Sequence, residues 1–180
     1  MAFTIAWDGI CIILHQKNPV SELKREEIIG IYTDKINNWK EVGGEDAPIT
    51  VVNKAEGRST LELFAKYLQL PTADMQADVV IGDNEQGIKT VVGNPQAIGY
   101  VSIGAAEYSA ASGNQIKLLP IAGVSASTAA VKKGKFPLAR PLNFVTREKP
   151  QGLVKDFIEF ARWPQVKQII EDQYFVYISK

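Results

Sequence analysis

The segment 54–60 has the residue types of an oxyanion-binding loop. It reads Lys-Ala-Glu-Gly-Arg-Ser-Thr and lies between a short apolar strand pattern and a helical pattern. The first turn of a helix has free backbone N–H groups at the positive end of the helix dipole, so an oxyanion placed there accepts several hydrogen bonds. Gly57 would let the backbone approach the ligand, and the hydroxyls of Ser59 and Thr60 would be further donors. We therefore predict that this segment binds an anion.

Four charged side chains bear on which anion the loop holds. Lys54 and Arg58 supply positive charge beside the helix start. Glu56 lies within the loop, where it either accepts the proton of hydrogen phosphate or neutralises Arg58. Asp8, beside Gly9 in the first strand pattern, is the other candidate acceptor, and a carboxylate there would repel fully ionised sulfate. A solvated or capping Asp8 is the alternative interpretation.

An ordinary helix start, capped by Ser59 or Thr60, is the alternative interpretation of the loop itself, because such caps are common. The loop is not a P-loop, since it lacks the second glycine before Lys-Ser/Thr, and it has no dinucleotide-binding glycine pattern. Further along the chain, Asp83 and Asn84 precede a short helical pattern, where they either cap that helix or line the same cleft. Spacing alone leaves these alternatives open.

The single cysteine and the single histidine do not form a catalytic pair. Cys11 lies in the apolar run 10–14, which favours a buried apolar role over a reactive thiol. His15 is four residues further along the same strand pattern, on the same face but too far away for a hydrogen bond. One His and one Cys are also too few for a zinc site. We therefore predict a protein that is not an enzyme, with no catalytic residue, no metal and no cofactor.

The composition fits a globular protein and argues against a nucleic-acid partner. The chain has 180 residues, of which 46% are hydrophobic, enough for one domain or two small lobes. Its 20 basic and 20 acidic residues give a formal net charge of zero, whereas nucleic-acid binders usually have a basic excess. No apolar run approaches the roughly 20 residues of a membrane span, and no signal peptide is visible.

Strand and helix patterns alternate along the chain, which predicts an α/β fold with a mixed or parallel sheet covered by helices. The expected strands are 3–14, 48–53, 78–81, 98–102, 116–121 and 142–146. The expected helices are 21–32, 58–70, 86–92, 103–111, 127–133, 152–162 and 165–173. Ser21 is the expected N-cap of the first helix, and Trp39 and Tyr100 are expected to pack rather than to contact a ligand.

Several stretches resemble the phosphate-binding proteins that serve ABC importers. They occur in that family's order and at its approximate spacing, from about residue 5 to the end: Trp7-Asp8-Gly9-Ile10, Lys17-Asn18-Pro19-Val20, Ile36-Asn37-Asn38-Trp39-Lys40-Glu41-Val42-Gly43-Gly44, Asn94-Pro95-Gln96-Ala97-Ile98-Gly99-Tyr100-Val101 and Phe136-Pro137-Leu138-Ala139-Arg140-Pro141-Leu142. Together these stretches make a specific match, although no single one would.

The resemblance implies two α/β lobes that close on an anion and are joined by crossing strands. Residues 14–141 would be a complete periplasmic-binding-protein-like lobe that carries the anion loop, with a mixed sheet flanked by helices. Residues 1–13 and 142–180 would be the crossing strands and C-terminal helices of an incomplete other lobe. The resemblance also implies non-catalytic binding of phosphate or a similar oxyanion for ABC-type import, a membrane ABC permease as partner, and a periplasmic or extracytoplasmic location.

The chain departs from the family in two ways. The family usually has about 80 further residues before the Asp-Gly-Ile stretch, a length that supplies much of the first lobe and its own Ser/Thr-rich anion loop. The family's loop in the second lobe typically reads Arg-x-x-Gly-Ser-Gly-Thr. Here Lys54 takes the arginine position, Arg58 replaces a serine and Ser59 replaces a glycine. Lysine lacks the fork of arginine, which Arg58 is placed to restore, so the identity of the anion stays open.

A second hypothesis is a truncated, self-associating scaffold or sensor domain that has lost solute binding. If the first-lobe strands are missing, a sheet edge and apolar surface are exposed, and both favour association. This hypothesis predicts a homodimer formed through the exposed sheet edge.

Overall fold

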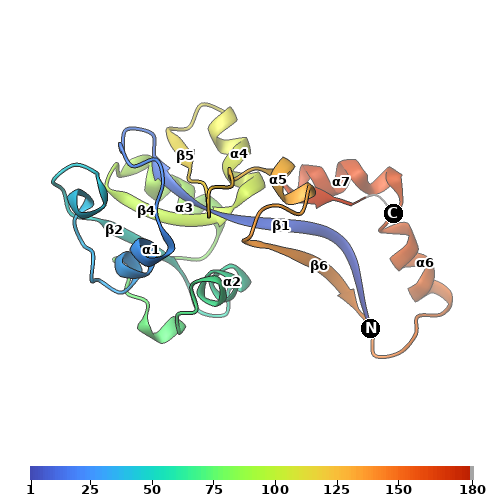
Figure 1. Cartoon of the computed structure of the whole chain (residues 1–180). Helices are drawn as coiled ribbons and strands as arrows, with labels where there is room; N and C mark the ends of the chain where they lie inside the picture. The colour runs from blue at the N-terminus through green and yellow to red at the C-terminus, as the bar shows by residue number, and fades with distance from the viewer. Residues whose placement is uncertain (179–180) are drawn as a thin grey trace.

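The long first strand, β1 (Ala2–His15), takes part in both ends of the structure, a computed structural model that describes residues 1–178 (Figure 1). Its second half pairs antiparallel with β4 (Ala97–Ser102) and β5 (Ile116–Leu118). Its first half pairs antiparallel with β6 (Ala139–Val145) and β7 (Val176–Tyr177). The strand therefore changes its partners between Gly9 and Ile10.

The remaining strands extend the sheet on the β4 side. β2 (Thr50–Lys54) pairs parallel with β4, and β3 (Val79–Ile81) pairs parallel with β2. The order along this path is β3-β2-β4-β1-β5, with β1 antiparallel to its neighbours. The sheet is mixed and helices flank it, so the predicted fold class is confirmed.

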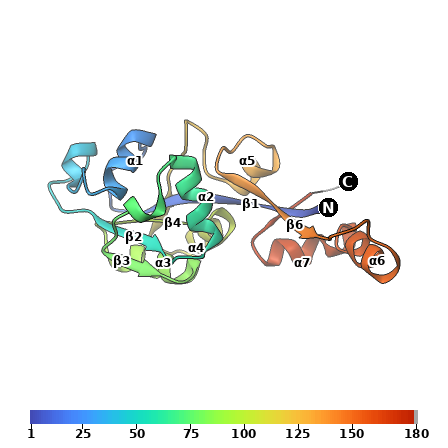
Figure 2. The ribbon, with the colours of Figure 1, turned by 90° about the horizontal axis from the view of Figure 1, so that it is seen from below.

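The helices fall into two groups along the molecule. Those on the side of β2 to β5 are α1 (Arg25–Tyr32), α2 (Ser59–Leu68), α3 (Asn84–Gly93) and α4 (Ile103–Ala111). Between the two groups, α5 (Thr128–Lys132) packs against β1, β7 and α4. Two more, α6 (Gly152–Phe160) and α7 (Lys167–Asp172), lie with β6 at the other end of the molecule (Figures 1 and 2). Short 3-10 turns occupy Trp39–Val42, Thr72–Asp74 and Pro164–Val166. None of the helices within residues 1–178 is long and apolar enough to cross a membrane.

The core is built around β1 and the apolar face of α2. Residues 10–14 of β1 are fully buried, as expected of a strand covered on both faces. Phe64 of α2 stacks on Tyr100 at a centroid distance of 4.0 Å and meets Tyr32 edge-on at 5.0 Å. Trp39 is also buried, and its indole N–H donates to the carbonyl of Gln96 at 3.0 Å. The prediction that Trp39 and Tyr100 pack in the interior is confirmed.

Cys11 is buried as predicted. Its side chain has no exposed surface, and its Sγ lies 3.8 Å from the carbonyl oxygen of Val101. Burial raises the pKa of the thiol far above its ordinary value, with the carboxylates of Glu107 and Asp8 adding to the effect. A group so strongly held in the thiol form is unreactive.

The first helix begins later than the sequence predicts. Ser21 was expected as its N-cap, but the structure places the cap at Lys24, and the prediction is wrong. The reason is Glu27, whose carboxylate accepts a hydrogen bond from the backbone N–H of Lys24 at 2.7 Å and so fixes the helix start. Upstream, Asn18 holds the chain in a turn by accepting from the N–H of Val20.

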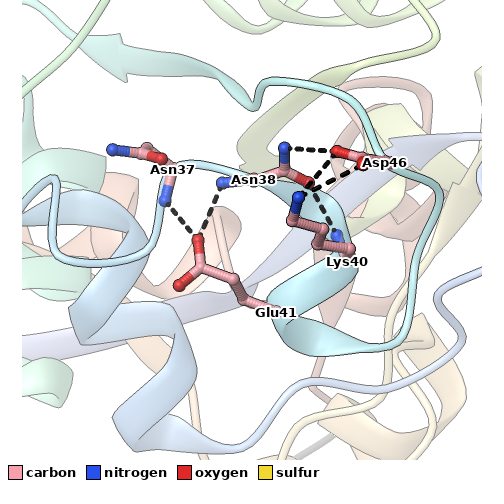
Figure 3. A network of polar contacts seen from close by, with 5 residues as sticks. All are labelled: Asn37, Asn38, Lys40, Glu41 and Asp46. Atoms are coloured by element: carbon pink, nitrogen blue, oxygen red, sulfur yellow. Dashed lines mark hydrogen bonds and ion pairs between the residues drawn. The ribbon is translucent and has the colours of Figure 1, made fainter.

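A network of polar contacts fixes the turn that buries Trp39 (Figure 3). Glu41 accepts from the N–H groups of Asn37 and Asn38, at 3.2 and 3.1 Å. Asn38 caps the turn by accepting from the N–H of Lys40, and its amide donates to Asp46. Lys40 also pairs with Asp46 at 3.1 Å, with both side chains largely exposed. These exposed polar contacts therefore hold the turn that places Trp39 in the core.

Candidate anion-binding site

Three helices begin at the same edge of the sheet. Strands β2, β3 and β4 run parallel, so their carboxyl ends lie at one edge. Each is followed by a helix that starts there: α2 after β2, α3 after β3 and α4 after β4. Ligands of open α/β sheets bind outside the carboxyl ends of the strands, and helix N-termini attract anions. The topology therefore gathers three positive dipole ends at the edge that carries the 54–60 loop.

The loop leaves backbone donors free at the start of α2. Arg58 is the N-cap, and its side chain makes no capping hydrogen bond. The amides of Leu61 and Glu62 donate to the carbonyl of Arg58 at 2.9 and 3.2 Å. Those of Ser59 and Thr60 have no acceptor within residues 1–178. Capping of the helix by Ser59 or Thr60, the ordinary alternative, is thus contradicted, and two amides of the first turn are available.

Gly57 is needed for its backbone conformation. Its φ of +75° lies in the left-handed region, and a Cβ built there would meet no atom within 4 Å. The turn before α2 is therefore open to solvent on this side, and the neighbouring residues Glu56, Arg58 and Ser59 are exposed. The backbone can approach a ligand here without interference from a side chain.

Lys54 is buried beneath the loop. Only 4% of its surface is exposed, and its Nζ donates to Oδ1 of Asn84 at 3.1 Å. Burial lowers the pKa of the ammonium to about 8; the carboxylate of Asp83 opposes this shift and the guanidinium of Arg58 adds to it. Lys54 is therefore charged at neutral pH but close to losing its proton, as is common for lysines in binding sites.

Arg58 and Glu56 do not pair with each other in the part of the chain that the structure describes. A guanidinium nitrogen of Arg58 lies 3.5 Å from the position that a Cβ of Gly82 would occupy, just after β3. Arg58 therefore reaches across the strand ends, where the absence of a side chain at Gly82 makes room. Glu56 forms no ion pair within residues 1–178, so direct neutralisation of Arg58 by Glu56 is not observed.

Asp83 and Asn84 take different roles. Asp83 caps α3, because its Oδ1 accepts from the N–H of Gln86 at 2.8 Å, which confirms the capping alternative for this residue. Asn84 instead turns its side chain toward the strand ends. Its Oδ1 accepts both from Lys54 Nζ and, at 3.3 Å, from the N–H of Ser102.

Asp8 is a buried residue of β1 with a full set of side-chain partners. It is 3% exposed, and both of its oxygens already have partners. Oδ1 accepts from the hydroxyl of Ser102 at 2.7 Å, and Oδ2 accepts from Nη2 of Arg140 at 3.1 Å. The structure thus connects Asp8 to Lys54, but through Ser102 and Asn84. The role of Asp8 as a direct proton acceptor remains a prediction.

Two residues of this site, Ser102 and Arg140, did not stand out in the sequence as site residues. Asn84 was a candidate either for capping or for lining the cleft, and the structure turns its side chain toward the strand ends. Arg140 lies 132 residues from Asp8 in the chain, so only the pairing of β1 with β6 brings the two together. The signal available in the sequence was a lone arginine in the otherwise apolar stretch 136–142, where a buried arginine needs an acidic partner.

Across residues 1–178, no cluster of three or more His, Cys, Asp or Glu side chains is placed to hold a metal ion. The charged groups at the loop include the two cations Lys54 and Arg58 and the carboxylates of Glu56 and Asp83.

The architecture is that of α/β proteins that bind ligands at the carboxyl edge of their strands. A model of the PBP superfamily domain matches residues 1–162, and the chain belongs to this superfamily.

Within it, the chain is similar to phosphate-binding proteins. It is 28% identical over 177 residues to the phosphate-binding protein PstS of Bacillus subtilis (strain 168), covering 97% of this chain and 57% of the relative. It is 32% identical over 136 residues to the phosphate-binding protein PstS 2 of Streptococcus pneumoniae serotype 4, covering 71% of this chain and 45% of the relative. The resemblance seen in the sequence motifs is confirmed. The chain spans about half the length of these two relatives, at 57% and 45%.

Solved structures of related proteins share the fold of this chain. A crystal structure from Clostridium perfringens that contains bound phosphate superposes with a TM-score of 0.83 at 29% identity, covering 99% of this chain and 72% of that chain. An ABC-type phosphate transport receptor from Vibrio cholerae superposes with a TM-score of 0.82 at 28% identity, covering 99% of this chain and 73% of that chain.

Proposed function

We propose that this chain binds phosphate or a similar oxyanion, without catalysis, at the loop 54–60 and in the service of ABC-type import. The observation that carries the proposal is the start of α2, where the amides of Ser59 and Thr60 have no acceptor among residues 1–178 and the buried Lys54 begins the same loop. A helix N-terminus and a nearby cation bind oxyanions in the same way. The names of the relatives, which are phosphate-binding proteins and a phosphate transport receptor, support this function.

Binding alone is proposed because the titratable side chains under the loop are already engaged. Lys54 donates to Asn84, Asp83 caps α3, and Asp8 is held by Ser102 and Arg140. A general acid or base must be within reach of a reacting group, and these side chains face one another instead. The protein is therefore proposed to be a receptor and not an enzyme, with Lys54, Glu56, Gly57, Arg58, Ser59 and Thr60 as its anion contacts.

We further propose a division of the chain into two lobes. Residues 14–141 form the lobe that carries the anion loop. Residues 1–13 and 142–180 belong to the other lobe and its crossing strands, of which residues 179–180 lie outside the described part. The change of partners along β1 between Gly9 and Ile10 supports a boundary in this region. A membrane ABC permease as partner and an extracytoplasmic location follow from the same family relationship.

A second candidate function is self-association, which is favoured by an open strand edge and exposed apolar side chains near α6. Within the described residues β6 pairs with β1 alone, so its other edge is open. Beside it, α6 exposes Leu153 by 84% and Phe157 by 56%. Open strand edges and apolar helix faces favour pairing with another copy. Light scattering that finds a strict monomer at high concentration would argue against a homodimer.

Calorimetric titration with inorganic phosphate tests the anion-binding proposal. Lys54→Gln removes the buried charge while keeping a hydrogen-bonding side chain of similar length. We expect it to weaken binding by about ten- to a hundredfold, because hydrogen bonds to charged groups contribute about 1.5–3 kcal/mol. Lys89→Gln is the matched control, since Lys89 is exposed and forms only a surface pair with Glu85. Absence of heat and of any thermal shift with phosphate, sulfate or molybdate would refute ligand binding by this chain.

A further inference from the structure

A continuous line of hydrogen bonds runs from the paired strands β1 and β6 to the anion loop. Arg140 Nη2 donates to Asp8 Oδ2 at 3.1 Å, and the Ser102 hydroxyl donates to Asp8 Oδ1 at 2.7 Å. The N–H of Ser102 donates to Asn84 Oδ1 at 3.3 Å, and Lys54 Nζ donates to that same oxygen at 3.1 Å. Five side chains from five separate elements thus form one network.

Three of the five residues in this network are almost completely buried. Asp8, Ser102 and Lys54 are 3%, 4% and 4% exposed. Buried polar groups cost free energy unless they are hydrogen-bonded, and a satisfied network is rigid. Asn84 has its carbonyl oxygen filled by two donors, so it cannot turn away without leaving Lys54 or Ser102 unpaired.

Strand pairing fixes the far end of the network. Asp8 and Arg140 face each other in the register of β1 and β6. Arg140 Nε is buried without a partner, and Asp8 is the only hydrogen-bond partner of this guanidinium within residues 1–178. Replacement of either Asp8 or Arg140 would therefore leave the charge of the other poorly solvated and unpaired.

Packing next to Asp8 ties this pair to α4. A Cβ built on Gly9 would come within 2.7 Å of Ile103, the first residue of α4, and within 2.6 Å of Val131. β1 is thus pressed against the start of the helix whose N-cap is Ser102. A shift of β1 at this point must move Ser102, which contacts both Asp8 and Asn84.

We propose that Asp8 and Arg140 are positioning residues of the anion site: they hold Ser102 and Asn84, and Asn84 holds the ammonium of Lys54 beneath the loop. This inference rests on the proposed anion binding. It assigns Asp8 an indirect role in place of direct contact with the anion. A direct acceptor would have to give up Ser102 or Arg140 to reach a ligand.

The two roles of Asp8 predict different anion selectivity. A carboxylate that accepts the proton of hydrogen phosphate favours phosphate over sulfate, so Asp8→Asn would change the ratio of the two affinities. A positioning carboxylate affects Lys54, which attracts both anions alike. We therefore expect Asp8→Asn and Ser102→Ala each to lower the affinities for phosphate and for sulfate by the same factor. That factor should be about three- to tenfold, the effect of one hydrogen bond.

Chemical labelling of Lys54 tests the network without any anion. The full chain is treated with a limiting amount of an amine-acetylating reagent, and acetylation of Lys54 is measured by mass spectrometry relative to the exposed Lys89. Asp8→Asn and Ser102→Ala should raise the relative labelling of Lys54 about three- to tenfold, since a looser ammonium is more accessible. Arg140→Lys, which keeps a cation opposite Asp8, should have a smaller effect. Asp46→Asn, which breaks the exposed pair with Lys40, is the control and should change nothing.

The outcomes separate the two proposals. If the wild-type chain binds neither anion by calorimetry, anion binding is refuted and the labelling alone decides the role of the network. Unchanged Lys54 labelling in both Asp8→Asn and Ser102→Ala would overturn the positioning role. So would an Asp8→Asn variant whose phosphate affinity falls while its sulfate affinity rises. Ser102→Ala removes only a hydroxyl, so it decides the question even if Asp8→Asn does not fold.

Discussion

The charge on Lys54 should make anion binding depend on pH. Burial lowers the pKa of this ammonium to about 8, so the charged fraction falls from about ten elevenths at pH 7 to about one eleventh at pH 9. If only the charged form binds, the affinity for phosphate falls about tenfold over this range. Phosphate itself becomes more negative as the pH rises, which would by itself strengthen binding. A fall in affinity is therefore opposite to the effect of the growing charge on the ligand.

Replacement of Lys54 by arginine separates this effect from others. An arginine stays charged throughout the range, so the Lys54→Arg variant should bind with an affinity that does not fall between pH 7 and 9. The assay is calorimetric titration of both proteins with phosphate at pH 7, 8 and 9 in buffers of equal ionic strength. A flat profile for the wild type, or an equal fall in the variant, would refute the assignment of this pH dependence to Lys54.

Three further predictions concern stability. Because the folded state lowers the pKa of Lys54 below its unfolded value, the buried charge destabilises the fold below pH 8, and this cost is lost as the pH rises from about 8 toward 10.5. Lys54→Met should therefore raise the free energy of unfolding near pH 7 by on the order of 2–3 kcal/mol. Urea unfolding should show that this difference from the wild type shrinks above pH 8, and a difference independent of pH would contradict the reasoning. Gly57→Ala should cost about 1 kcal/mol because its φ is +75°, whereas Gly93→Ala at the end of α3, with no atom within 4 Å, should be neutral or stabilising; equal effects in urea titration would show that conformation is not the cause. Phe64→Ala should cost about 3–5 kcal/mol by thermal unfolding, since it empties the fully buried stack on Tyr100, and a loss below 1 kcal/mol would mean that the cavity collapses.

Local patterns in the sequence predicted the elements well because each element has its own periodicity. The strand before Lys54 and the apolar face of α2, with Leu61, Phe64, Ala65 and Leu68 buried, both follow from residue spacing alone. The start of α1 could not be predicted as well, because Ser21 and Lys24 are both close to the helix. The choice between them depends on which backbone N–H the side chain of Glu27 reaches.

The candidate site was predictable only in part, for a physical reason. The loop residues 54–60 are neighbours in the chain, so their meeting at a helix start is a local property. Asp8, Ser102 and Arg140 meet through strand pairing across long distances in sequence, and single residues carry no signal of their partners. An acidic residue beside a glycine is visible in a sequence, whereas the buried ion pair of Asp8 with Arg140 is not.

The path of β1 also affects how the chain folds. Its second half pairs with β4 and β5, whereas Ala2 pairs with Val145 and Trp7 with Val176. The amino-terminal half of this strand therefore pairs only with segments that lie more than a hundred residues further along the chain. Contacts so distant in sequence are slow to close and leave strand edges exposed in the meantime. Residues 2–9 are thus expected to be among the last to acquire their native neighbours.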